Sequence, residues 1–156
     1  MVGSPESQLK VVAHLRDGKL IKGYFSSLPT MELDTLKNQP IDMPHLVHVE
    51  EEGSGARIEV PAEMLKALFF VKSFEGRTNY RELKFFQVAP EYAGLWVRVT
   101  FFDGETTEGL VHNAIETFVS PGFVLKPPDP LSNNELAYVM KASLVDVKVL
   151  GVKTSY

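Results

Sequence analysis

The chain has 156 residues, of which 44% are hydrophobic and 23% charged, so it can form one ordinary globular domain or two very small ones. It contains no cysteine, which excludes disulfide bonds, thiolate nucleophiles and zinc or iron–sulfur sites held by cysteine. The formal net charge is −4, with lysine and arginine scattered among acidic residues, so nucleic acid is an alternative partner that the charge disfavours.

The N-terminal segment MVGSPESQLK has no apolar stretch of the signal-peptide type, and no later run is long and apolar enough to span a bilayer. We therefore expect a cytoplasmic protein without membrane contact. A β-hairpin is predicted next, from VVAHLRDGKLIKGYF, because apolar and polar residues alternate from Val11 onward. His14 lies on its outward face and is expected to be exposed. Asp17-Gly18 predicts a two-residue turn, and Gly23 predicts a bulge or bend in the return strand.

The rest of the first half is predicted to hold a variable stretch of turn residues and then three short strands. The predicted strands span residues 46–49, 57–60 and 68–73. PAEMLKAL, from Pro61, is expected to add one helical or 3₁₀ turn before the last of them. His45 and His48 lie three positions apart in a strand, where they face opposite sides, so we expect boundary residues and no metal site.

An ordered connecting segment is predicted over residues 77–94. Its apolar side chains are expected to pack against one or both halves; they are Phe85, Phe86, Val88 and Tyr92. The second half opens with VRVTFFDGETTEGLV from Val97, which again places Asp-Gly between two strands. Further strands are predicted over residues 123–126, 136–139 and 144–150, after a second variable stretch.

The two hairpin sequences indicate an internal duplication. An offset of 86 residues aligns Asp17-Gly18 with Asp103-Gly104 and Gly23 with Gly109, without a gap. The later strands follow in the same order, and each last strand is preceded by a Lys-Ala step, at Lys66 and at Lys141. We therefore predict a first small-barrel repeat with an N-terminal extension over residues 1–76 and a second over 95–156. Because a core below roughly 70 residues supplies little stability alone, the two should pack as one unit.

The hairpins resemble the opening of Sm-like and SH3-like small barrels, which implies an all-β fold (minor α) of two tandem barrels. The Sm-like resemblance also implies RNA binding through the loops after the second and fourth strands. His112 and Asn113 occupy the first of these loops in the second repeat. The chain further resembles an uncharacterised bacterial β-rich family, through FFVKSFEG at residues 69–76 and PGFVLKPPDPLSNNE at 121–135. That resemblance implies a place beside signalling or regulatory domains.

No recognisable catalytic motif is present. The sequence lacks a nucleophile elbow, a phosphate loop and a dinucleotide fingerprint, and its carboxylates are dispersed. We therefore expect no enzymatic activity, no cofactor and no metal. A hydrolase whose site forms only in the folded pair of repeats is a distant alternative.

The preferred hypothesis is a non-enzymatic intracellular binding or adaptor module, regulatory in role, that contacts a protein partner or a second copy of itself. Its candidate surfaces are Phe102 and the proline-rich loop that contains Asn133 and Asn134. The alternative is a sensor for a small ligand (a nucleotide) or RNA, bound in the groove between the repeats. All candidate residues together are Tyr24, Phe25, Phe102, His112, Asn113, Lys126, Asn133 and Asn134.

Overall fold

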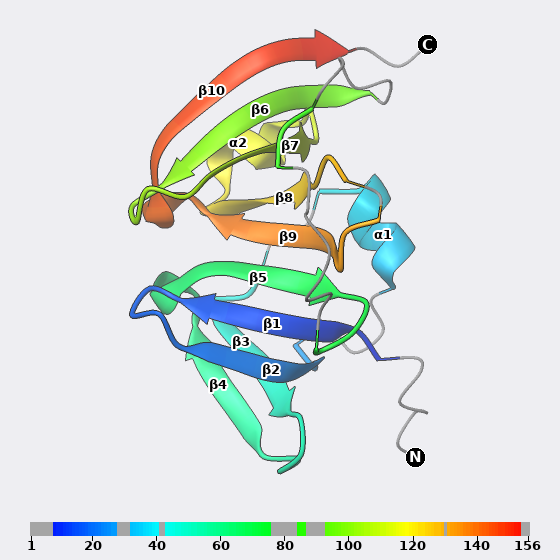
Figure 1. Cartoon of the computed structure of the whole chain (residues 1–156), viewed down its shortest axis with the longest axis vertical. Helices are drawn as coiled ribbons and strands as arrows, with labels where there is room; N and C mark the ends of the chain where they lie inside the picture. The colour runs from blue at the N-terminus through cyan, green and yellow to red at the C-terminus, as the bar shows by residue number, and fades with distance from the viewer. Residues whose placement is uncertain are drawn as a thin grey trace.

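The computed structural model describes residues 8–27, 32–40, 43–75, 84–86, 93–129 and 131–153. Within these residues, ten strands form a single antiparallel sheet in the order β10-β6-β7-β8-β9-β5-β1-β2-β3-β4 (Figure 1). The strands are β1 (Lys10–Leu15), β2 (Leu20–Phe25), β3 (Leu46–Glu51), β4 (Arg57–Pro61), β5 (Leu65–Val71), β6 (Gly94–Phe101), β7 (Thr106–Val111), β8 (Gly122–Lys126), β9 (Asn134–Met140) and β10 (Leu144–Lys153). The prediction of an all-β protein with minor helix is confirmed.

Short helical elements lie between successive strands at matching places in the two halves. Between the second and third strands of each half lies one short α-helix, α1 (Leu33–Asn38) or α2 (Ile115–Val119). Between the fourth and fifth strands lies a 3₁₀ turn, η2 (Ala62–Met64) or η3 (Lys141–Ser143). The turn at η2 confirms the expectation for PAEMLKAL. Both α-helices lie in stretches for which the sequence predicted only turns, because each is too short to show a helical period.

The strands pair in the same pattern in both halves. The fifth strand returns to pair with the first, so β5 pairs with β1, and β10 pairs with β6. Each of these two ladders contains a bulge near its start, with Lys66 as the extra residue in β5 and Val145 as the extra residue in β10. Lys66 therefore lies within a strand, whereas Lys141 begins η3, so the two Lys-Ala steps are not equivalent in space.

The two halves join through β5 and β9, which lie side by side in the middle of the sheet (Figure 1). Four consecutive apolar pairs make this junction: Ala67 with Val139, Leu68 with Tyr138, Phe69 with Ala137, and Phe70 with Leu136. Alternate residues serve different cores. Leu68 and Tyr138 belong to the core of the first half, and Ala67 and Val139 to the core of the second. Each half thus completes the other's core.

The Asp-Gly turns differ from the predicted two-residue form. Gly18 donates its N–H to the Leu15 carbonyl at 3.0 Å, and Leu15 donates to the Lys19 carbonyl at 2.9 Å, so three residues form the loop. Gly18 has φ +95°, and the described residues include no non-glycine with positive φ. Because the Asp17 carboxylate accepts the Lys19 N–H at 2.9 Å, Asp17 stays in the turn and only the glycine takes the left-handed conformation.

Gly23 and Gly109 are needed for close approach of a neighbouring strand. The β1–β2 ladder passes through Gly23 without a register shift, so the predicted bulge is absent there. A Cβ at Gly23 would collide with the Glu50 carbonyl oxygen, and one at Gly109 would lie 2.5 Å from Leu125 Cγ. Each glycine lets its strand press against the third strand of its half, which is a packing requirement.

Candidate functional site

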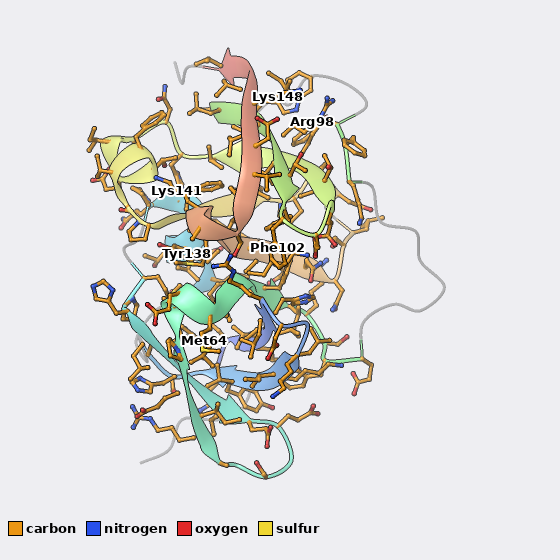
Figure 2. All side chains as sticks on the ribbon, turned by 90° about the vertical axis from the view of Figure 1, so that its left-hand side faces the viewer. Met64, Arg98, Phe102, Tyr138, Lys141 and Lys148 are labelled. Carbon is orange, nitrogen blue, oxygen red and sulfur yellow. The ribbon has the colours of Figure 1, made fainter. Side chains whose placement is uncertain are left out.

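An exposed apolar surface covers β10 and α2. Its members, which we call the β10–α2 surface, are Ile115, Phe118, Val119, Val145, Val147 and Val149. The three valines of β10 are 46–67% exposed, and Phe118 of α2 is 59% exposed. Figure 2 shows β10 along the front of the molecule, with α2 to one side of it. Exposed aliphatic residues are normal when scattered singly, but a contiguous group of this kind indicates an interaction site.

The first half buries what the second half leaves exposed. Leu36 on α1 is fully buried, whereas Phe118, at the corresponding place on α2, is 59% exposed. In the same way, β5 is covered by β9, whereas β10 ends the sheet and pairs only with β6 among the described strands. In the first half, the surface that corresponds to the β10–α2 surface is covered by other parts of the molecule. In the second half, this surface is left open among the described residues.

A hollow of about 360 Å³ lies within this surface. Phe118 from α2 and the valines of β10 line its rim, and its floor includes core residues such as Val97 and Phe123. The hollow is mainly apolar, so an inserted side chain would be stabilised by burial.

A second candidate site is a groove between helix α1 and the strands β7 and β8. Two adjoining cavities, of about 330 and 390 Å³, share Lys37, Leu110 and Lys126 among their lining residues. His112 lines the first cavity and Lys72 the second. We call this the lysine groove, defined by Lys37, Lys72, His112 and Lys126. It brings residues of both halves together, as the alternative hypothesis expects.

The lysine groove has an electrostatic character suited to an anion. Burial lowers the pKa of Lys126, and the positive charge of Lys37 lowers it further. A bound anion would relieve that repulsion. Asp129 and Glu135 also line the second cavity, so the groove is mixed in charge rather than uniformly basic.

Three sequence-predicted residues meet at this groove. His112 and Lys126 line the first cavity, and Asn134 lines the second. Asn113 is exposed beside His112, at the start of the turn that leads into α2. Asn133 has a structural role, since its amide group accepts the Ser73 N–H at 3.0 Å and donates to the Ser73 carbonyl at 2.9 Å.

The remaining candidates lie elsewhere. Phe25 is a core residue that packs edge-on against Phe70, with 5.5 Å between ring centroids. Tyr24 is half-buried and packs against Phe74. Phe102 is 43% exposed, and the Arg16 guanidinium lies 5.5 Å from its ring centroid, so the first half partly covers it. The structure does not bring these three to the lysine groove.

A buried carboxylate anchors the connecting segment to the second half. Glu108, only 2% exposed, accepts hydrogen bonds from the Phe86 backbone N–H at 3.0 Å, from Trp96 Nε1 at 2.9 Å and from both Nε and Nη2 of Arg98. Burial alone would raise the pKa of Glu108, but these donors together lower it. Phe86 also packs against Trp96, and Phe85 lies beside Arg98, so both contact the second half as predicted. Val88 and Tyr92 lie outside the described residues.

Charged groups also cross the junction between the halves. Lys66 donates to Asp103 at 2.7 Å and lies 3.6 Å from Glu105. His14 is half-buried beneath these residues, 4.5 Å from the Phe69 ring, and is not exposed as the strand alternation predicted. The reason is that the second half covers this face of β1. Burial lowers the pKa of His14, Lys66 lowers it further, and Glu105 opposes the shift.

Comparison with known proteins identifies the family. A model described as a family of unknown function, DUF6982, matches residues 7–151. The chain belongs to this family. A search of curated proteins found no match, and a search of solved structures found none either. Within the described residues, the histidines and carboxylates form no group of three or more that could hold a metal ion, and no helix has the length and apolar character needed to cross a membrane.

Sequence reasoning missed the β10–α2 surface. The signal was present, because LDTLKN at Leu33 and IETFVS at Ile115 share an apolar–acidic–threonine–apolar order. Periodicity cannot tell which member of such a pair is covered, since that depends on which strand ends the sheet.

Proposed function

We propose that this chain is a non-enzymatic intracellular binding module that acts through protein–protein contacts in a regulatory role. The observation that carries the proposal is the β10–α2 surface, where the edge strand β10, which pairs only with β6 among the described strands, and an exposed helix meet around an apolar hollow. Docking onto a rigid sheet costs little conformational entropy, and an exposed edge offers backbone groups for strand addition. The absence of cysteine supports an intracellular location.

A substitution in the hollow tests the proposal. A partner is first identified by proximity labelling and then purified. Phe118→Lys should abolish the binding of this purified partner. Leu131→Lys is the matched control, because Leu131 has the same exposure, 59%, but lies outside the surface. Equal binding by Phe118→Lys and the unsubstituted protein would contradict the proposal, provided that their circular dichroism spectra agree.

We also propose that the fold arose by duplication of a five-stranded Sm/SH3-like small barrel. The repeated pairing order, the matching bulges and the 3₁₀ turn before each fifth strand support this proposal. The corresponding boundaries are residues 1–76 for the first repeat, 77–94 for the connecting segment and 95–156 for the second repeat.

A second candidate function, binding of a small phosphate-bearing ligand such as a nucleotide, is favoured by the lysine groove. Lys37 of α1, Lys72 directly after β5 and Lys126 of β8 line adjoining cavities there. Binding of inorganic phosphate or a nucleoside triphosphate, measured by NMR chemical-shift perturbation, should weaken in Lys126→Ala and at higher salt. Lys19→Ala, on an exposed turn, is the control. Shifts that are equal in both variants would contradict groove binding.

A further inference from the structure

The edge strand β10 is chemically self-complementary. From Leu144 to Leu150 it reads LVDVKVL, which is the same in both directions except that Asp146 is exchanged for Lys148. Antiparallel pairing of β10 with a second copy, centred on Val147, therefore places Asp146 of each copy opposite Lys148 of the other. Val147 faces Val147 at the centre, and the symmetry of the sequence continues outward with valine at 145 and 149 and leucine at 144 and 150. Opposite charges directly across an antiparallel pair stabilise it, and like charges destabilise it.

We propose that two copies of this chain associate through β10 into a symmetric dimer with one continuous sheet. The proposal rests on the proposed function, because it names a second copy as the partner of the β10–α2 surface. A two-fold axis passing beside Val147 uses the same patch on both copies, so the association closes at two.

Electrostatics within one copy also favour this pairing. Lys148 pairs across the β6–β10 ladder with Arg98, whose guanidinium is itself ion-paired with Glu108, so Arg98 offers Lys148 no negative partner on this face. The Asp146 carboxylate in the same chain is 3.9 Å from Lys148 Nζ, and both side chains are more than half exposed. In the dimer, Lys148 gains a second carboxylate directly opposite, from Asp146 of the other copy.

The apolar face is extended by the same arrangement. Val147 and Val149 pair with Val99 and Val97 of β6, so they lie on the core face, at the hollow that Phe118 also lines. Residues directly opposite in an antiparallel pair share a face. The hollows of the two copies therefore become neighbours on one side of the continuous sheet, and their exposed valines are buried together.

Other registers and partners fit less well. Moving the centre to Lys148 places two lysines opposite each other. In head-to-tail association, β10 of one copy would pair with β4 of another copy in the register that β5 has with β9. This pairing places Val147 opposite Glu59 and Val149 opposite Arg57. The internal junction has an apolar pair at each of these positions, so β4 is a poor partner. Its charged residues and the terminal Pro61 are typical of a protected edge.

Bulges limit the length of the new ladder but do not prevent it. In β10, register shifts flank the regular stretch Asp146–Val149. In β5 a bulge lies at the corresponding place, and β5 still pairs with β9 through four consecutive residues beyond it.

Charge reversal tests the dimer. We expect the full-length protein to dissociate from dimer to monomer on dilution in analytical ultracentrifugation. Asp146→Lys and Lys148→Asp should each weaken the dimer by about tenfold or more, because each dimer contains the affected pair twice. The double variant D146K/K148D should restore the affinity of the unsubstituted protein. A mixture of the two single variants should form a heterodimer, because both of its charge pairs are complementary.

The control is Glu59→Lys on β4, which should leave the dimer unchanged. The proposal would be overturned if the unsubstituted protein were monomeric at millimolar concentration. It would also be overturned if the single variants dimerised normally. A double variant that keeps the native circular dichroism spectrum but does not recover the dimer would overturn it as well. If the protein is monomeric and Phe118→Lys still loses a purified partner, the dimer is wrong and the proposed function stands. If the dimer forms and Phe118→Lys loses no partner, the surface serves self-association alone.

Discussion

Glu108 shows how one buried charge can hold residues 84–86 of the connecting segment against the second half. Its carboxylate receives donors from the connecting segment, from Trp96 and from Arg98, and the Lys84 carbonyl accepts its backbone N–H at 2.7 Å. A buried carboxylate is tolerated only when its oxygen atoms are satisfied in this way. Sequence alone placed Glu108 on a strand, but could not show that a backbone amide, an indole and a guanidinium converge on it.

Glu108→Gln should lower the free energy of unfolding by about 2 kcal/mol at neutral pH. The value is modest because Arg98 is 41% exposed and its ion pair is screened by solvent. The pKa of Glu108 is lowered in the folded state, so its contribution is present above the unfolded pKa and is lost as the pH falls through the folded value.

Urea unfolding at several pH values checks this prediction. The stability difference between the two proteins should shrink in acid, because protonated Glu108 resembles glutamine. Glu116→Gln, exposed on α2, is the control. A difference that is constant between neutral and strongly acidic pH would show that the charge of Glu108 does not matter.

At the scale of the element, the repeated hairpins contain glycines with two different roles. Gly104 has φ +90° and open space around its α-carbon, so its role is conformational. Gly109 has an ordinary φ but is pressed against Leu125 and the Lys126 carbonyl, so its role is steric. The sequence predicted the hairpins and most strand positions correctly, because alternation and turn residues are local signals. It could not predict why Gly109 is required, since the third strand is distant in sequence.

Gly109→Ala should destabilise the protein by about 2–3 kcal/mol, because the added methyl group forces β7 and β8 apart. Gly104→Ala should cost only about 1 kcal/mol, the strain of placing alanine in the left-handed region. Thermal or urea unfolding of both variants compares the two mechanisms. A larger loss in Gly104→Ala would contradict the steric role of Gly109.

At the scale of the whole molecule, the β5–β9 junction makes one cooperative unit from two halves. Leu136, Tyr138 and Met140 of β9 lie in the first core, and Ala67 of β5 lies in the second. Sequence reasoning predicted that the halves pack together, because each was too small alone. It could not identify the joining strands, since all the closing strands are apolar and any could have been central. For the same reason, the alternative hypothesis placed a site between the halves and named His112 and Lys126, but it did not name Lys37 and Lys72, because the groove forms where α1 of one half approaches the other.

Tyr138→Ala should lower the stability of both halves together, by about 3–4 kcal/mol, because it removes a large side chain that is 1% exposed at the junction. Trp96 is the only tryptophan in the sequence and lies in the second half, so its fluorescence reports that half. Far-UV circular dichroism reports the whole sheet. The two urea transitions should coincide in both proteins and shift by the same amount, and separate midpoints would show that the halves unfold independently.

The order in which the ribosome makes the strands gives the junction a further consequence. β5 is complete at Val71, but its partner β9 begins only at Asn134. At ordinary rates of translation, the first half waits roughly 3–15 s for β9. During that interval β5 has an open apolar edge, and the first core lacks the side chains that β9 supplies. The chain therefore most needs a chaperone while its first half is complete and β9 has not yet been made. Mispairing of the open β5 edge would be greatest where neighbouring ribosomes are crowded together.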